Sequence, residues 1–362
     1  MPGVLLAALL ASLAATGLSQ VDPLNEFANK TIFPQEQASN VTKYLTEAAS
    51  LATDPRLYQY FMDQCIVQQV YPQLFSMPSG FVAPFKAFDN FYFVGHTGVS
   101  AWAYDTGDGL LVIDALNNQD EIDAVMLPML EELGFQGEDI KGVIITHEHL
   151  DHYGGAKYLQ DRFGVKVYGS APFWDAMAAL PVNATPPAPA KDETVSDGQE
   201  VTLGSVTITT VATPGHTLGT ISLIFPLFEN GETHVAGLSG GTGTPNNQTL
   251  RQMKVASQNR FADIASEKGV DVLLSNHQVA DHAVQNADIL AHSAPNATNP
   301  FVIGVESFSN YMRINAICSQ VIAARQGMNL GAQGGNDTAS RLRRNVDNLF
   351  ATPLNEHAGC AS

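Results

Sequence analysis

Four side chains that can bind a metal ion fall within six consecutive positions of the chain. These are His147, His149, Asp151 and His152. Imidazole nitrogens and carboxylate oxygens are common ligands of divalent transition metals in proteins. Isolated histidines are usually ordinary surface residues, but four ligand-type side chains this close together rarely arise by chance. The spacing therefore indicates a metal-binding loop.

The residues on either side of this loop predict how it is held. Residues 142–145 form an apolar, mostly β-branched run that is typical of a buried parallel strand. A helix over residues 156–163 is expected to follow Gly154 and Gly155. The loop then lies at the C-terminal end of a strand, which is where open α/β sheets bind their ligands.

The direction of the four side chains depends on the conformation of the loop. In an extended backbone, successive side chains point to opposite sides. We therefore expect His147, His149 and Asp151 to point one way and His152 to point the other way. A loop of this kind can supply ligands to two adjacent metal ions.

Two further histidines also follow expected strands. His216 comes after an alternating strand over residues 206–212, at a Pro-Gly turn, and His277 comes directly after the apolar run 270–275 and one asparagine. Both positions lie where a strand is expected to reach the edge of a sheet. We expect their imidazoles to meet the loop at 147–152.

The pattern His-x-His-x-Asp-His resembles the zinc-binding signature of the metallo-β-lactamase-fold hydrolases. The resemblance covers residues 85–325 and implies two Zn²⁺ ions. His147, His149 and His216 match the first site, with one position left open for water. Asp151, His152 and His277 match the second site. Asp151 is also implied as the catalytic residue that orients the attacking hydroxide and carries a proton to the leaving group.

One segment departs from the pattern of many members of this family. Their second site is bridged or completed by an aspartate or a cysteine that would fall within residues 235–244, which contain neither a carboxylate nor a thiolate. With His277 supplied instead, the ligand set looks like the third subclass of metallo-β-lactamases. It looks less like that of the glyoxalase-type or lactonase-type relatives.

The resemblance implies a zinc-dependent hydrolase that opens an amide or ester bond in a small molecule, nominally a β-lactam or related lactam. Zinc lowers the pKa of its bound water towards about 7, which supplies hydroxide at neutral pH. A lactonase or a thioesterase using the same dizinc site is an alternative, and so is an iron-dependent oxidoreductase of the same fold. A non-catalytic binding module would be expected to have lost ligands, yet all six residues are present.

Several neighbouring residues each allow two interpretations. Asp114 closes an expected strand and either supports the metal loop, as the resemblance implies, or caps a turn. His96 either borders the cleft or is an ordinary turn residue, and Tyr153 either lines the pocket or packs at the start of a helix. Glu148 is expected to face solvent or a backbone amide, and Trp174 is more often a packing residue than a substrate contact.

Strands alternating with helices fill the chain between these sites. This α/β order, in two runs that each begin with strands, favours the αββα four-layer sandwich that the resemblance also implies. Strands are expected at 91–94, 99–104, 110–114, 142–145, 165–168, 201–203, 206–212, 221–225, 234–236 and 270–275, and helices at 41–52, 57–70, 121–133, 156–163, 248–268 and 311–324, with a further short helix beginning at Pro172 and one at 340–350.

The chain divides into four expected regions. Residues 1–19 look like a secretory signal peptide, because an apolar stretch too short to span a bilayer is followed by the small residues Gly17 and Ser19. Residues 20–85 form an N-terminal helical extension, 86–326 the catalytic domain, and 327–362 a C-terminal tail. We therefore expect a secreted, extracellular protein.

Charge and sequons bear on partners and compartment. The chain has 36 acidic and 18 basic residues, a formal charge of −18, so its surface should repel nucleic acid and anionic membranes. Six Asn-x-Ser/Thr sequons agree with a glycoprotein: Asn29, Asn40, Asn183, Asn247, Asn296 and Asn336. Cys65, Cys318 and Cys360 allow one disulfide, but their spacing does not select the pair, and the oligomeric state is left open.

Overall fold

The computed structural model describes residues 33–75, 80–294 and 297–330. The expected signal peptide, the helix at 340–350 and Cys360 lie outside the described residues, as do the sequons at Asn29, Asn296 and Asn336. Across the described part of the chain, the helices are too short or too polar to cross a bilayer.

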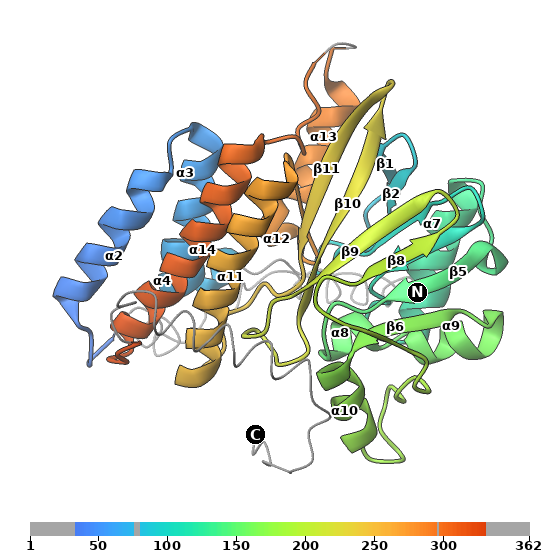
Figure 1. The fold of residues 1–362 in the computed structure, drawn as a ribbon, viewed down its shortest axis with the longest axis horizontal. Helices are drawn as coiled ribbons and strands as arrows, with labels where there is room; N and C mark the ends of the chain where they lie inside the picture. The colour runs from blue at the N-terminus through green and yellow to red at the C-terminus, as the bar shows by residue number, and fades with distance from the viewer. Residues whose placement is uncertain (1–32, 76–79, 295–296, 331–362) are drawn as a thin grey trace, which may run out of the picture.

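Two β-sheets form the centre of the molecule (Figure 1). The first sheet has seven strands in sequence order, antiparallel from β1 to β4 and parallel from β4 to β7. Its strands are β1 Phe85–Phe88, β2 Phe91–Phe93, β3 Trp102–Asp105, β4 Leu110–Ile113, β5 Ile140–Ile144, β6 Lys166–Ser170 and β7 Glu193–Val195.

The second sheet has five strands in the order β12-β11-β10-β9-β8, and only its β11–β12 pair is parallel. Its strands are β8 Glu200–Leu203, β9 Val206–Ala212, β10 Ile221–Glu229, β11 Glu232–Ser239 and β12 Val272–Ser275.

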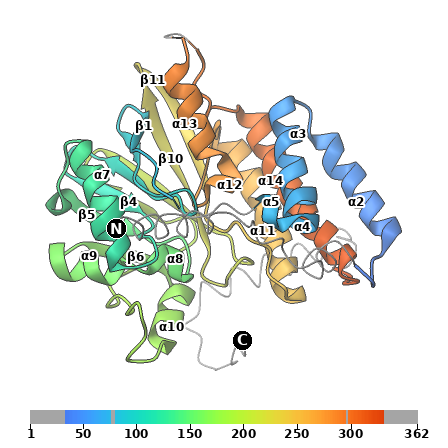
Figure 2. The same cartoon turned by 180° about the vertical axis from the view of Figure 1, so that it is seen from behind.

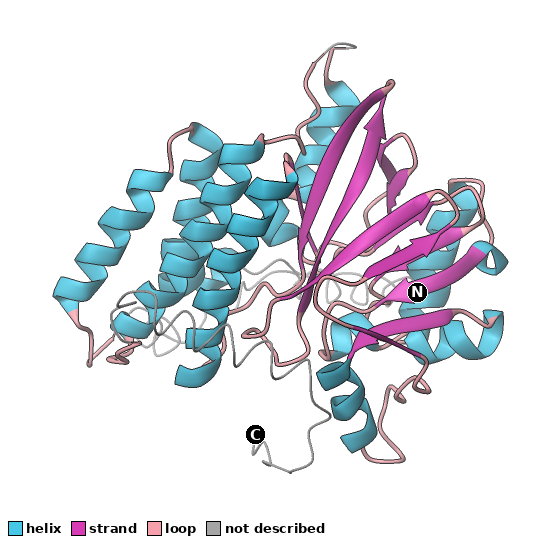
Figure 3. Ribbon diagram, in the orientation of Figure 1, coloured by secondary structure: helices cyan, strands magenta, loops and turns pink. Residues whose placement is uncertain are grey.

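Helices cover the outer face of each sheet (Figure 3). The helices beside the first sheet are α6 Gln119–Glu121, η2 Ile122–Met126, α7 Leu127–Glu132, the turn η3 Gly137–Asp139, α8 Leu150–Tyr153, α9 Ala156–Phe163 and α10 Ala171–Ala179. Those on the side of the second sheet are α11 Gln248–Lys268, α12 Gln278–Asp281, α13 Ala283–His292 and α14 Val305–Arg325.

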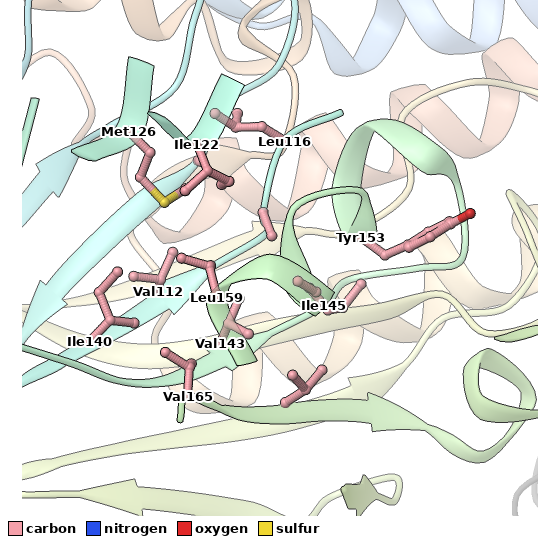
Figure 4. Packing of buried hydrophobic residues seen from close by; sticks show 14 of the residues in the cluster. Val112, Leu116, Ile122, Met126, Ile140, Val143, Ile145, Tyr153, Leu159 and Val165 are labelled. Atoms are coloured by element: carbon pink, nitrogen blue, oxygen red, sulfur yellow. The ribbon is translucent and has the colours of Figure 1, made fainter. Parts of the chain in front are cut away.

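Strand alternation explains why the sheets stack. In β4, Leu110 and Val112 belong to the apolar cluster beneath the helices, whereas Leu111 and Ile113 belong to the cluster between the sheets. Figure 4 shows the first of these clusters, in which Val112 and Val143 lie with Leu159 of α9. A third cluster fills the space between the second sheet and its helices. Three apolar layers therefore separate four layers of secondary structure, which confirms the αββα sandwich.

The N-terminal extension packs on the outside of the second helical layer, as Figures 1 and 2 both show. It consists of α2 Ala38–Leu51, α3 Pro55–Met62, η1 Asp63–Val67, α4 Gln68–Val70 and α5 Pro72–Phe75. Val41 and Leu57 share the third apolar cluster with Val211 and Ile224 of the second sheet. A disulfide between Cys65 and Cys318 joins the extension to α14.

Most of the expected elements are present, and α11 and α9 begin and end at the expected residues. The expectation of an extended metal loop is wrong at its second half, because Leu150–Tyr153 forms the helical turn α8. Sequence patterns also gave no indication of the short strands β1 and β7 or of helices α12 and α13.

Candidate metal centre

The six candidate ligands arrive from the ends of strands that share one edge of the sandwich. Ile144 at the end of β5 pairs with Ile113 at the end of β4, and Ser275 at the end of β12 pairs with Ser239 at the end of β11. The loops that leave these strands therefore meet, together with the turn after β9 that carries His216. This is the edge where parallel strands present their carboxyl ends.

The first group comprises His147, His149 and His216. His147 Nε2 lies 3.1 Å from His149 Nδ1. His216 Nε2 lies 3.1 Å from His147 Nε2 and 3.0 Å from His149 Nδ1. The side chain of His147 is fully buried and His149 is exposed, so the group is open to solvent on one side.

The second group comprises Asp151, His152 and His277. His152 Nε2 lies 3.2 Å from His277 Nε2. Asp151 Oδ2 lies 3.3 Å from His152 Nε2 and 3.4 Å from His277 Nε2. The imidazole rings of His147 and His152 are 4.2 Å apart, so the two groups are adjacent. Within the described residues, these two groups are the ones with metal-ligand geometry.

Helix α8 decides which group Asp151 joins. An extended loop would direct Asp151 to the same side as His147 and His149, whereas the helical turn brings its carboxylate beside His152. The turn is held by long-range backbone bonds, since Ala115 N–H donates to the His152 carbonyl and Gly154 N–H donates to that of Leu116. Residues after β4 therefore set the geometry of the metal loop.

Asp114 supports the metal loop from below. It is fully buried, and its carboxylate accepts hydrogen bonds from Thr146 N–H at 2.7 Å, Thr146 Oγ1–H at 2.9 Å and His152 Nδ1–H at 2.8 Å. Its backbone has φ +63°, an uncommon value outside glycine. The structure therefore favours the supporting role for Asp114 over the capping role.

Three of the other imidazoles, those of His147, His216 and His277, are oriented by carbonyl or hydroxyl oxygens at Nδ1. His216 Nδ1–H donates to Gly243 O at 2.8 Å, and His277 Nδ1–H donates to Gly98 O at 2.7 Å. His147 Nδ1 lies 3.1 Å from Thr146 Oγ1, which also accepts from Asn276 Nδ2 at 2.9 Å. Each of these bonds places the proton on Nδ1 and leaves an electron pair on Nε2.

These orientations make the nitrogens fit a metal ion. Electron pairs that face one another at about 3 Å repel unless a cation lies between them. Zinc in tetrahedral geometry with Zn–N bonds of about 2.0–2.1 Å holds its nitrogens about 3.3 Å apart. The nitrogen–nitrogen separations in the structure, 3.0–3.2 Å, are close to this value. The donor set, five imidazoles and one carboxylate, also suits zinc.

The two groups differ in their electrostatics. Burial lowers the pKa of His147 and His216 well below the usual range, and it also lowers the pKa of His149. The first group therefore consists of neutral imidazoles near neutral pH.

The second group contains an ion pair in the metal-free protein. Burial opposes the charge on His152, but Asp114 and Asp151 raise its pKa to about 9. Burial would raise the pKa of Asp151, yet its hydrogen bond to His152 and the positive charge there hold this pKa well below its usual range. Burial lowers the pKa of His277 to about 4.

Glu148 joins the two loops of the first group. Its carboxylate accepts from Thr217 Oγ1–H at 2.7 Å and from Gly219 N–H at 3.2 Å, both in the turn that carries His216. The expectation that Glu148 faces a backbone amide is thus confirmed.

Lys254, which sequence reasoning missed, holds the segment that completes the first group. It lies on α11, and its buried Nζ donates to Gly241 O at 2.8 Å and to Thr242 O at 3.1 Å. The next carbonyl, of Gly243, orients His216. Burial lowers the pKa of Lys254 to about 7. No local signal marks this lysine, because it lies within an ordinary helical pattern.

His96, Tyr153 and Trp174, which each allowed two interpretations, have structural roles. His96 is buried in its turn, where Nδ1 accepts from Gly98 N–H at 3.0 Å. Tyr153 belongs to the apolar layer drawn in Figure 4, so the packing interpretation holds for it. Trp174 is also buried, and its Nε1–H donates to Glu193 O at 3.0 Å.

Comparison with known proteins agrees with this geometry. Residues 94–227 match the Metallo-beta-lactamase superfamily. The chain contains a metallo-beta-lactamase domain. The match ends before β11, so α11, β12 and His277 lie beyond the matched residues.

The curated relatives that this chain matches are named hydroxyacylglutathione hydrolase. The protein of Acidiphilium cryptum (strain JF-5) is 31% identical over 138 residues, which are 38% of this chain and 45% of that protein. The protein of Brucella anthropi is 34% identical over 91 residues, 25% of this chain and 31% of that protein. The chain thus spans less than half the length of these relatives.

Solved structures match the metallo-beta-lactamase domain over a longer stretch. BJP-1, a subclass B3 metallo-beta-lactamase of Bradyrhizobium japonicum, is 25% identical with a TM-score of 0.55, and covers 64% of this chain and 90% of its own. A Cronobacter sakazakii metallo-beta-lactamase with a HARLDQ motif is 26% identical, with a TM-score of 0.56, and the match covers 71% of this chain and 99% of that protein. FEZ-1 of Legionella gormanii shares the fold. It is 19% identical with a TM-score of 0.58, and the match covers 70% of this chain and 100% of FEZ-1. These comparisons support a hydrolytic, metal-dependent enzyme.

Proposed function

We propose that this chain is an exported, dizinc hydrolase that opens an amide bond in a small molecule, with a β-lactam or related lactam as the nominal substrate. The observation that carries the proposal is the pair of adjacent three-residue groups, with His277 completing the second. Structural neighbours that are metallo-beta-lactamases support it, since the chain matches 90–99% of two of them.

Zinc bound at these groups would lower the pKa of a water molecule towards about 7 and polarise a carbonyl group. The chain contributes the shape and proton chemistry of the site. His147 and His152 form its buried floor, while the exposed His149 and the half-buried Asp151 border the side that a substrate can reach. The Asp151 carboxylate is ionised, so it can orient an attacking water, accept its proton and pass that proton to a leaving nitrogen.

A purified sample expressed without added metal tests this proposal. We expect elemental analysis to find zinc, and turnover of β-lactams that a chelator removes and added zinc restores.

His149→Ala and Asp151→Ala should lose at least about 100-fold in kcat/KM, as for removal of a group that acts in the transition state. His292→Ala on α13 is the matched control, because that side chain is 77% exposed and should leave turnover unchanged. Wild-type turnover that survives complete metal removal would exclude the mechanism, and bound iron in place of zinc would favour the oxidoreductase alternative.

Thioester hydrolysis is the second candidate, because the curated relatives are named hydroxyacylglutathione hydrolase. The two reactions differ in the leaving group, since an amide nitrogen must gain a proton whereas a thiolate leaves without one. Asp151→Asn should therefore slow amide substrates more than thioesters. A panel of β-lactams, lactones and thioesters, assayed with both proteins, ranks the candidates directly.

Export is the remaining part of the proposal. The disulfide between Cys65 and Cys318 supports it, because such bonds persist in oxidising compartments. Asn183 lies exposed in the loop between α10 and β7, where a glycan would meet no packed surface. Sequencing the amino terminus of protein recovered from the medium, and its mass before and after enzymatic deglycosylation, test export and glycosylation.

A further inference from the structure

The N-terminal extension contacts the segment that carries His277. Directly after this histidine comes α12, a helix of four residues whose C-cap is His282. His282 has φ +56° and ψ +35°, in the left-handed region that a residue other than glycine seldom occupies. Surrounding contacts must hold such a backbone in place.

Two side chains of the extension supply those contacts. The ring of Tyr60 on α3 stacks on the His282 imidazole, with centroids 4.5 Å apart and planes at 14°. Its hydroxyl donates to Asp281 O at 3.1 Å. Asp63 Oδ2, one turn further along the chain, lies 2.9 Å from His282 Nε2.

The body of the domain also holds α12. Tyr311 of α14 donates its hydroxyl to Ala280 O at 2.8 Å, and the buried Asp281 carboxylate accepts from Ser275 N–H at 2.7 Å and Ala283 N–H at 2.9 Å. Tyr60 and Tyr311 also contact one another, with ring centroids 4.9 Å apart. Side chains of α14 and of the extension therefore clamp the C-terminal end of α12 together.

We propose that Tyr60 and Asp63 are positioning residues for the second metal group, acting on His277 through α12. The inference rests on the proposed metal function and gives the N-terminal extension a role in it. His277 comes two residues after the end of β12, so the orientation of its imidazole depends on the path that the chain takes into α12. A shift of α12 would move His277 Nε2 away from His152 and Asp151.

The first metal group is oriented by residues outside this clamp. His147 is held by Thr146, and His216 is held by Gly243, a residue of the segment anchored by Lys254. Thr146, Gly243 and Lys254 all lie outside α3 and η1. Loss of the clamp should therefore weaken binding of one metal ion and spare the other.

The test compares Tyr60→Leu and Asp63→Ala with Tyr58→Leu. Tyr58 lies on the same helix and is 52% exposed, which makes it a matched control for loss of an aromatic ring from α3. The two stepwise affinities for Co²⁺ are measured by chelator competition, with the d–d spectrum reporting each site. We expect the affinity of the second group to fall about 10-fold or more, as for other residues that orient metal ligands, with the affinity of the first group unchanged. Equal loss at both sites, or no loss at either, would overturn the inference.

Hydrogen exchange separates this inference from the proposed function. In metal-free protein, amides of residues 276–283 should exchange faster in Tyr60→Leu than in wild type or Tyr58→Leu. Unchanged exchange there would refute positioning whatever metal the protein binds. A wild type that takes up a single ion would instead refute the dizinc function, while exchange would still decide the role of the clamp. Tyr60→Phe, which removes only the hydroxyl, provides a second measurement if the leucine variant does not fold, and its exchange must also rise for the inference to stand.

Discussion

At the scale of single residues, His152 differs from the other imidazoles of the centre. Its Nδ1–H is bonded to the buried Asp114, and its Nε2 faces Asp151, so two carboxylates favour the protonated ring. His147 and His216 face no such pair, and burial keeps them neutral. A metal ion that binds the second group would therefore have to displace a proton, whereas one that binds the first group would not.

This difference predicts how metal affinity depends on pH. The pKa of His152 in the metal-free protein is raised to about 9, so a proton competes with the metal at every pH below that value. Second-site affinity should rise about tenfold per pH unit between pH 6 and 9, since one proton is released per ion bound. First-site affinity should stay nearly level above pH 7. Chelator competition in a pH series measures both.

Asp114→Asn provides the control for this measurement. Removing one carboxylate lowers the pKa of His152, so the pH range over which second-site affinity rises should shift downwards. Affinities of the two sites that vary with pH in the same way would contradict this assignment of the proton.

At the scale of elements, the junction after α8 determines where Asp151 lies. Gly154 packs its backbone against the loop after β4, and a Cβ added there would be 1.8 Å from Asn117 O and 2.7 Å from Leu150 O. Both are backbone atoms, so no side-chain rotation can relieve the overlap. The close approach of the two loops requires glycine at this position.

Gly154→Ala should therefore destabilise the protein, by about 1–3 kcal/mol or more, as for other overpacked sites. Denaturant unfolding of the metal-free protein measures the loss. Gly80→Ala is the matched control, because a Cβ there would meet only the Thr97 side chain, at an ordinary 3.5 Å. A Gly154→Ala protein as stable as the control would mean that the two loops can separate without cost.

Short elements explain where sequence-based prediction failed. Alternation and apolar runs located the longer strands and α11, because each of these buries a continuous face. Strand β7 has three residues and α12 has four, too few for a period to be visible. Helix α8 depends on backbone bonds to Ala115 and Leu116, which local sequence does not encode.

At the scale of the whole molecule, the extension is part of the fold rather than a separate unit. Its buried residues share an apolar cluster with the second sheet, and the disulfide closes a segment of 253 residues between Cys65 and Cys318. Cross-links stabilise chiefly by restricting the unfolded chain, and more so for long segments.

Replacing both cysteines, Cys65→Ser with Cys318→Ser, should lower the free energy of unfolding by about 2–4 kcal/mol. Chemical denaturation of wild type with and without a phosphine reductant that does not bind zinc provides the comparison. Reduced wild type should unfold at the same denaturant concentration as the double variant. Identical stability of oxidised and reduced wild type would show that the cross-link contributes nothing.

The sequence by itself determined the metal-binding residue types and the strand ends that present them. Spacing within residues 147–152, and strands before His216 and His277, were sufficient because these are local features. Tertiary structure decided the side to which Asp151 turns, the Cys65–Cys318 pair, and the roles of Lys254 and Tyr60. Each of these depends on contacts between segments far apart in the chain, and local propensity and periodicity carry no information about which distant segments will meet.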